Sequence, residues 1–333
     1  MICIDDIYQA QRRISQYVHR TPVMESHLLN EWLGHRILFK TECLQRIGAF
    51  KIRGAVNAIA RMQEENRLPQ HIVANSSGNH AQAVALAAKL FGIRATIFGG
   101  NNISTIKAAA TRAYGAELRL FDSRIEADEA VQQAALQPDI QWLPPFNHVD
   151  IMAGQGTAVV EALEDCDPVD AVAVPCGGGG LLSGSYVAAK AKNPAIQVIA
   201  AEPLSSNDAA ESRRKGEIVR FSGAPTTLAD GAATPSVGDL TFPFVKMAEG
   251  FYEVSELAIQ YWTQWLQHLL KLHVEPTCAM TMQAVVDWLN DTQPEQPQTI
   301  LVVISGGNIA ADKMAAIWQK DFLSQVPGLH LDL

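Results

Sequence analysis

Four consecutive glycines constrain this chain more than any other feature of its sequence. Gly177, Gly178, Gly179 and Gly180 join an apolar, valine-rich run at 169–174 to a segment of helical composition at 181–192. Such apolar runs are typical of buried parallel strands, so the glycines lie where a strand gives way to a helix. Because glycine has no Cβ, successive N–H groups can turn inward there, and the helix N-terminus adds positive potential. The segment therefore predicts a phosphate-binding loop.

The spacing of the glycines separates two kinds of phosphate ligand. A dinucleotide fingerprint, G-x-G-x-x-G, places Leu182 at its third glycine position when it starts at Gly177, and Ser183 there when it starts at Gly178. The loop thus favours a single phosphomonoester over a dinucleotide. The structural alternative is a tight turn without a ligand, which rarely needs four glycines.

Composition excludes several classes of partner. The chain has 333 residues, 48% of them hydrophobic, which is enough for a sizeable core in one large or two moderate domains. Its net charge of −9 supplies no basic surface for a nucleic acid or an anionic membrane. We therefore expect no nucleic acid and no membrane among its partners.

Three features of the sequence predict a cytoplasmic protein. Asp5 and Asp6 stand where a signal peptide needs basic and then apolar residues. The uncharged run at 171–189 is interrupted by Pro175 and by the glycines, so it does not predict a membrane helix. Five cysteines, an odd number without C-x-x-C spacing, suit a reducing compartment.

Strand and helix patterns alternate along most of the chain. A first series, which ends before Pro144-Pro145, has predicted strands at 71–75, 93–98 and 116–121 and predicted helices at 81–91, 104–114 and 125–136. A second series has predicted helices at 157–164, 181–192, 256–270, 280–289 and 309–320 and predicted strands at 169–174, 197–201 and 299–304. This alternation predicts an α/β fold of parallel sheets covered by helices, with ligands at the carboxyl ends of the strands.

Two further loops lie between a predicted strand and a predicted helix. Asn75-Ser76-Ser77-Gly78-Asn79-His80 brings hydroxyls, an amide and backbone N–H groups to a helix N-terminus, where a substrate carboxylate would be stabilised. Ile304-Ser305-Gly306-Gly307-Asn308 offers a hydroxyl at a strand end. Each loop alone is equally well explained as a helix cap and a turn. Three such loops in one chain indicate an active site.

One lysine lies in an apolar context. Lys51 is placed between Phe50 and Ile52, where desolvation would lower its pKa and make the amine nucleophilic. The residue pattern alone does not select it, because it is one of eleven lysines and a solvated side chain explains any of them equally well.

Taken together, these segments resemble the ordered motifs of pyridoxal-phosphate enzymes of the tryptophan synthase β fold type, fold type II. The similarity is greatest to the serine racemase and threonine/serine dehydratase branch, and it runs from about Ile4 onward. The motifs are Phe50-Lys51-Ile52-Arg53-Gly54-Ala55, Ser76-Ser77-Gly78-Asn79-His80, the glycine loop with Leu181 and Gly184, and Ser305-Gly306-Gly307-Asn308. Shorter matches are Arg20-Thr21-Pro22, Ala153-Gly154-Gln155-Gly156-Thr157, Ala229-Asp230-Gly231 and Glu275-Pro276-Thr277.

The resemblance implies two doubly wound parallel-sheet domains. These are a large cofactor-binding domain at 1–70 and 146–333 and a small mobile domain at 71–145. It further implies a homodimer that acts on a small amino acid. The reaction is β-elimination from serine, threonine or 3-hydroxyaspartate to a 2-oxo acid and ammonia, with serine racemisation as a further activity or as the main one.

The resemblance also implies roles for individual residues. Lys51 carries the cofactor as a Schiff base and acts as the base at the substrate Cα. The other cofactor-binding residues are Phe50 beside the ring, Asn79 at the ring hydroxyl, Ser305 at the pyridine nitrogen, Asn147, Leu181 and the four glycines at the phosphate. Ser76, Ser77, Asn79 and His80 surround the substrate carboxylate, with the backbone amide of His80 preferred over its ring as the contributing group. Ser77 also acts as the second acid or base, on the face opposite Lys51, which racemisation needs and elimination does not.

A pair of carboxylates beyond a predicted strand suggests a metal site. Glu202 and Asp208 are six residues apart, with the Ser206 carbonyl between them. Hard oxygen ligands of this kind suit Mg²⁺ or Ca²⁺. By itself the spacing indicates surface acids, but in this location it resembles the divalent-cation site of serine racemases and hydroxyaspartate dehydratases.

Two other functional classes fit parts of the sequence. An NAD-dependent oxidoreductase would use Glu202 as its ribose-binding acid, but the glycine spacing does not fit and Lys51 is left without a role. A silent ligand-binding relative would lack the lysine, which is present.

Overall fold

Helices and strands alternate through the computed structural model, which describes residues 1–76, 78–101, 103–223 and 225–330. The strands are β1 (Val23–Glu25), β2 (Arg36–Thr41), β3 (His71–Asn75), β4 (Arg94–Gly100), β5 (Glu117–Phe121), β6 (Ile140–Trp142), β7 (Ala171–Pro175), β8 (Gln197–Pro203), β9 (Gly250–Val254) and β10 (Thr299–Ile304). The helices are α1 (Ile4–Ile14), α2 (His27–Leu33), α3 (Lys51–Glu64), α4 (Asn79–Leu90), α5 (Thr105–Ala113), α6 (Arg124–Ala134), α7 (Val149–Asp165), α8 (Gly180–Lys192), α9 (Asp208–Lys215), α10 (Phe242–Met247), α11 (Glu256–Leu270), α12 (Pro276–Thr292) and α13 (Ala311–Ile317). Short 3₁₀ turns are η1 (Glu42–Leu44), η2 (Leu204–Ser206) and η3 (Asp230–Ala232).

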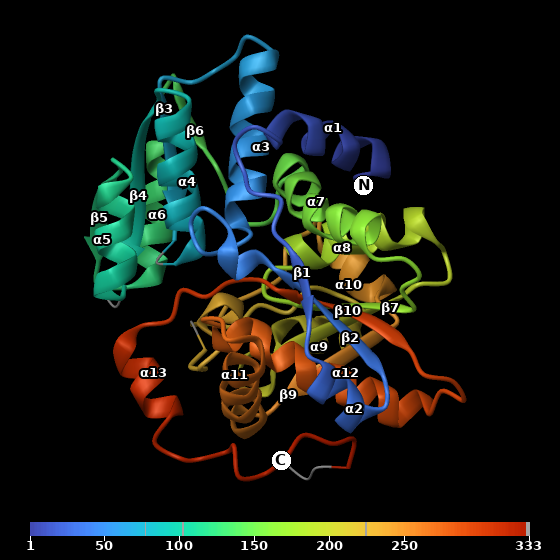
Figure 1. The fold of residues 1–333 in the computed structure, drawn as a ribbon. Coiled ribbons are helices and arrows are strands. Elements are labelled where there is room, and N and C mark those ends of the chain that lie inside the picture. The colour runs from blue at the N-terminus through green and yellow to red at the C-terminus, as the bar shows by residue number, and fades with distance from the viewer. Residues whose placement is uncertain (77, 102, 224, 331–333) are drawn as a thin grey trace.

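The larger sheet is formed by both ends of the chain. In the described residues it has six strands in the order β1-β2-β10-β7-β8-β9, with β1 antiparallel to β2 and the other neighbours parallel. Alternate side chains of its central strands enter two different cores. Val302 faces α11 and α12, whereas Leu301 and Val303 face α1, α7 and α8. Helices therefore cover both faces, as Figure 1 shows.

The smaller sheet comes from one continuous stretch of chain. Its four described strands have the order β5-β4-β3-β6 and are all parallel. It lies to one side of the larger sheet with α4, α5 and α6 around it (Figure 1). Helix α3 packs with α4 in the core of this side, beside Ile72 and Ile97. The predicted α/β fold of parallel sheets is confirmed; the division into a large domain and a mobile small domain at 71–145 stays a prediction.

Helix α7 begins earlier than the sequence predicted. We expected a helix at 157–164, and the structure has one over Val149–Asp165. Two glycines weaken the helical pattern of the first turns. A Cβ at Gly154 would lie 2.6 Å from the Cα of Gly54, and one at Gly156 would lie 2.8 Å from the carbonyl oxygen of Gly184. Because Gly154 and Gly156 have no side chains, α7 can contact α3 on one side and α8 on the other.

Two other helices differ from the predicted bounds, and a third matches them. Helix α12 starts at Pro276 rather than at 280, because proline is well suited to the first turn of a helix. The predicted helix at 309–320 is shorter, Ala311–Ile317. The helix expected at 256–270 is found over Glu256–Leu270, where Ser255 caps it by accepting a hydrogen bond from the Ala258 N–H. None of the helices in the described ranges is long and apolar enough to span a membrane.

Candidate active site

A cavity of about 440 Å³ opens between the two sheets, at the carboxyl ends of their strands. The sequence-predicted residues that line it are Phe50, Lys51, Ser76, Asn79, His80, Gly177, Gly178, Gly179, Gly180, Leu181 and Ser305. They come from four separate segments of the chain, which the fold brings to one place. Ser77 lies outside the described residues.

Lys51 is the first residue of α3, and its amine is at the cavity wall. The Nζ atom donates a hydrogen bond to the Pro145 carbonyl oxygen at 2.7 Å and lies 5.3 Å from the centre of the Phe50 ring. Desolvation lowers the pKa of Lys51 to about 8, and the charge of Glu275 opposes this shift. Near neutral pH the unprotonated, nucleophilic fraction of the amine is therefore larger than for an ordinary lysine.

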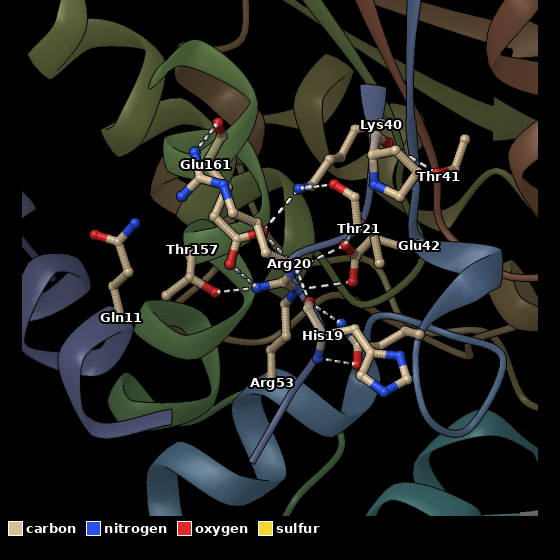
Figure 2. Close-up of polar contacts among 12 residues, drawn as sticks. Gln11, His19, Arg20, Thr21, Lys40, Thr41, Glu42, Arg53, Thr157 and Glu161 are labelled. Carbon is tan, nitrogen blue, oxygen red and sulfur yellow. Dashed lines mark hydrogen bonds and ion pairs between the residues drawn. The ribbon is translucent and has the colours of Figure 1, made fainter. Parts of the chain in front are cut away.

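A buried ion cluster fixes the helix that carries Lys51. Arg53, two residues along α3, donates to Glu42 Oε2 at 2.7 Å and to Glu161 Oε1 at 2.8 Å. Lys40 donates to the same Glu161 side chain at 2.7 Å. Figure 2 shows these side chains converging from β2, η1, α3 and α7. Two cations and two carboxylates balance, so the cluster ties the first turn of α3 to both α7 and the larger sheet.

The glycine loop has no room for side chains. A Cβ at Gly178 would lie 2.2 Å from the Phe146 ring, and Gly179 has a φ of 87°, in the left-handed region. The loop is held from behind by the Thr241 hydroxyl, which donates to the Gly178 carbonyl oxygen at 2.7 Å. Helix α8 begins at Gly180, so its unpaired N–H groups face the cavity end of β7. This arrangement can accommodate a phosphate group.

Two polar atoms of the cavity lack a partner within the described part of the chain. The Ser305 hydroxyl, at the end of β10, is buried and makes no hydrogen bond there. The same holds for Nδ1 of His80. The other ring nitrogen of His80, Nε2, lies 2.9 Å from the Leu143 carbonyl oxygen and therefore carries the proton. Both unpaired atoms are available to a bound group.

His80 is not suited to carry a proton as a cation. Desolvation, aided by the charge of Lys51, lowers the pKa of His80 to about 3. The imidazole is therefore neutral throughout the physiological range. The part of the His80 backbone amide, near the N-terminus of α4, in substrate binding stays a prediction.

The cavity also contains a second set of charged residues, to which the sequence patterns assigned no role. Glu275, Lys107, Asp230 and Lys313 line it with the predicted residues. Glu275 is buried, which raises its pKa to about 7. The sequence motifs included Glu275 and Asp230 but assigned them no role. Lys107 and Lys313 carry no local pattern that would single them out.

The comparisons with known proteins agree with this geometry. A model of the pyridoxal-phosphate dependent enzyme family matches residues 14–306. The chain is 38% identical over 314 residues to L-threo-3-hydroxyaspartate ammonia-lyase of Saccharomyces cerevisiae, covering 94% of this chain and 95% of that protein. The protein belongs to the pyridoxal-phosphate-dependent enzymes.

Solved structures of this family have the same fold. Maize serine racemase superposes with a TM-score of 0.88 at 37% identity, over 94% of this chain and 96% of that one. A threonine deaminase from T.th. superposes with a TM-score of 0.85 at 37% identity, over 93% and 99% of the two chains. The expected family and fold type are thereby confirmed, and the NAD-dependent alternative has no support.

The residues of this enzyme fit pyridoxal phosphate. The glycine cradle, which a Cβ would fill, accommodates the phosphate, and the unpaired Ser305 hydroxyl suits the ring nitrogen. Asn147 was expected to contact the cofactor, and this stays a prediction. Its side chain donates to Asp239 and accepts from the Leu240 N–H, and it is absent from the described lining of the cavity.

The predicted metal ligands lie together, away from the cavity. Glu202 ends β8 and accepts hydrogen bonds from the N–H groups of Ala209 and Ala210, both at 2.9 Å. Asp208 begins α9, and both its carboxylate oxygens are buried without a partner among the described residues. Burial raises the pKa of Asp208 to about 7, and burial together with the charge of Asp208 raises that of Glu202 well above its usual range.

This donor set fits a cation with few protein ligands. Within the described ranges no group of three or more His, Cys, Asp or Glu side chains gathers as a metal site. Ser206, fully buried in η2 between the two acids, can add its carbonyl oxygen. Waters would complete the coordination, as is usual for Mg²⁺ and frequent for Ca²⁺.

Proposed function

We propose that this enzyme eliminates the β-hydroxyl group of an amino acid, giving a 2-oxo acid and ammonia, and that it also racemises serine. The observation that carries the proposal is the placing of the Lys51 amine, the Ser305 hydroxyl and the glycine loop around one cavity. The candidate substrates are serine, threonine and 3-hydroxyaspartate. The relatives described above are named for reactions of these three amino acids.

Each part of the cavity wall has a distinct task. Bound pyridoxal phosphate supplies an electron sink for the charge that develops at the substrate Cα. Lys51 holds the cofactor and then removes the Cα proton. Ser305 is a neutral hydroxyl, so it does not keep the ring nitrogen protonated as a carboxylate would, and this favours loss of the β-hydroxyl over transamination. Ser76 and the N-terminus of α4 bind the substrate carboxylate.

Racemisation requires a second acid or base on the opposite face. We assign this task to Ser77 from its position in the motif. A predominantly racemising enzyme is the second candidate function, because the chain is as similar to a serine racemase as to a threonine deaminase, 37% in both cases.

We also propose a divalent cation, Mg²⁺ or Ca²⁺, bound by Glu202, Ser206 and Asp208. The buried, unpaired oxygens of Asp208 support it, because a charged carboxylate in that position costs free energy unless a cation compensates it. A homodimer in the cytoplasm completes the proposal. The family resemblance supports the dimer, and five cysteines without a disulfide in the described structure support a reducing compartment.

The experiment combines a spectrum, a covalent label and an assay. The purified protein should be yellow, and borohydride reduction followed by peptide mapping should place the pyridoxyl label on Lys51. Ammonia release is then measured from the L- and D-forms of the three candidate amino acids. Lys51→Ala should lose elimination and racemisation together, whereas the exposed Lys89→Ala control keeps both. A label on another lysine would refute the assignment.

A further inference from the structure

A chain of hydrogen bonds runs behind the cavity wall from a backbone carbonyl to a buried carboxylate. The Asn308 Nδ2 atom donates to the Ile47 carbonyl oxygen at 2.7 Å and to Asn79 Oδ1 at 2.9 Å. The Asn79 Nδ2 atom donates to Oε1 and Oε2 of Glu275, both at 3.1 Å. Asn79 and Glu275 line the cavity, and Asn308 is not among its described lining residues.

The chain has one consistent direction. A backbone carbonyl only accepts, so the Ile47 oxygen requires the NH₂ group of Asn308. That NH₂ group in turn requires the oxygen of Asn79. The NH₂ group of Asn79 is then turned toward Glu275, whose carboxylate accepts. The two ends of an asparagine amide have nearly the same shape, so the hydrogen bonds and not the packing decide which end faces where.

Glycines make room for both ends of this chain. Gly48 has a φ of +71°, and a Cβ there would lie 2.7 Å from Asn308 Oδ1. A Cβ at Gly306 would lie 2.6 Å from Glu275 Oε1. The backbone is held as well, since the Gly307 N–H donates to the Gly48 carbonyl oxygen at 2.9 Å. The backbone thus leaves space for the side chains of Asn308 and Glu275, to which the sequence motifs assigned no role.

We infer that Asn308 and Glu275 are positioning residues, which fix the amide of Asn79 so that its NH₂ group is the donor available to the cofactor. The inference rests on the proposed function, because it concerns the residue expected at the ring hydroxyl oxygen. An amide NH₂ group has two hydrogens, and one hydrogen directed between the two Glu275 oxygens, which both lie 3.1 Å from Nδ2, can serve both contacts. The second is free to donate to a bound oxygen, and a flipped amide would present an acceptor instead.

Asn308→Asp is the variant that tests this inference. Aspartate has the same shape as asparagine but donates no hydrogen bond, so the Oδ1 atom of Asn79 would lose its donor and Asn79 would lie between two carboxylates. Its amide would then no longer be held in one orientation, and the donor to the cofactor would no longer be fixed. We expect the dissociation constant of pyridoxal phosphate, measured by titrating the apoenzyme, to rise about tenfold. We also expect the visible absorbance maximum of the loaded enzyme to shift.

A matched control separates this effect from simple destabilisation. Asn57 is also buried, on α3, and its Nδ2 atom donates to the Asp150 carbonyl oxygen at 2.7 Å. Asn57→Asp should lower the melting temperature and leave the cofactor affinity and the spectrum unchanged. Equal losses of affinity in the two variants would overturn the inference.

A second substitution separates positioning from a structural role. In the Asn308→Asp background, Glu275→Gln supplies an NH₂ group that favours the reversed orientation of Asn79 and restores the net charge. We expect the melting temperature of the apoenzyme to recover, while the affinity and the spectrum stay altered. Recovery of all three together, or an Asn308→Asp protein that binds the cofactor as the wild type does, would refute the inference. Failure of the proposed function would instead appear in the wild type, as an absence of label on Lys51.

Discussion

The Nζ atom of Lys107 lies 2.9 Å from the Oδ2 atom of Asp230, and this ion pair joins the two sides of the cavity. Lys107 is on α5, beside the smaller sheet, and Asp230 begins η3, which packs against α12. Lys313 of α13 reaches the same carboxylate oxygen at 3.4 Å. Lys107 is almost fully buried, so solvent screens its contact with Asp230 only weakly.

Loss of that pair is the first testable change. Asp230→Asn leaves the buried Lys107 without its charged partner and loosens the two sides of the cavity. We expect kcat/KM to fall about tenfold, since a lost charged hydrogen bond of this kind costs about 1.5 kcal/mol. Steady-state kinetics measure this. Glu117→Gln, which breaks an exposed pair with Arg119 on β5, should leave the kinetics unchanged. Similar kinetics for the two variants would contradict the prediction.

Cofactor loading should depend on pH through Lys51. Its pKa is lowered to about 8, so the neutral amine that attacks the cofactor aldehyde accumulates at a lower pH than for an ordinary lysine. The rate at which the apoenzyme regains its yellow colour should therefore rise with pH, with a midpoint near 8, and level off above it. Stopped-flow absorbance gives the profile. A midpoint near the ordinary lysine value of 10.5 would show that the amine is solvated.

Ser77 should separate the two reactions, because only inversion at Cα needs a proton donor on both faces. Ser77→Ala is expected to abolish the interconversion of L- and D-serine. Elimination should persist from the enantiomer whose Cα proton faces Lys51. Chiral chromatography and ammonia release measure the two rates in one sample. Racemisation at the wild-type rate would leave the two-base assignment without support.

The carboxylate pair should respond to metal ions. Binding that favours the folded protein stabilises it by mass action, so Mg²⁺ or Ca²⁺ added after chelation should raise the melting temperature and the activity. Asp208→Asn should weaken both responses and leave the yellow colour in place. Glu211→Gln, a neighbouring change on α9 at a residue paired with Arg214, should not. If chelators and added cations change neither the melting temperature nor the activity, Glu202 and Asp208 do not bind a metal ion.

The buried ion cluster of Arg53, Lys40, Glu42 and Glu161 should contribute more to the free energy of unfolding than the exposed ion pairs do. Glu42→Gln removes one carboxylate from a buried Arg53, and such losses cost about 3–5 kcal/mol in the free energy of unfolding. Arg20→Ala, whose half-exposed partners are Glu164 and Asp165, should cost less than about 1 kcal/mol. Urea denaturation measures both. Comparable decreases in the free energy of unfolding for the two variants would mean that the buried cluster contributes no more than the exposed pair.

Features of the site that lie within a few consecutive residues could be predicted from the sequence. Lys51, the glycine loop and the strands around it each occupy a few consecutive residues, and the structure brings them to the cavity. The links between distant segments were not predictable. Asn79 bonds to Glu275 and to Asn308, which are 196 and 229 positions away, and no pattern along the chain joins them. The early start of α7 was missed for a related reason, because its glycines serve neighbouring helices rather than their own.

The double role of α7 has a further consequence. It touches the helix of Lys51 through Gly54 and Gly154, and the helix of the glycine loop through Gly156 and Gly184. The distance between the Lys51 amine and the glycine loop is therefore set by direct backbone contacts of α7 with α3 and α8. A side chain added at any of these four glycines would collide with the neighbouring helix, so substitutions there cannot be used to change the substrate. Changes of specificity are better placed on the facing wall, where Asn75, Ser76 and Phe98 line the cavity with side chains.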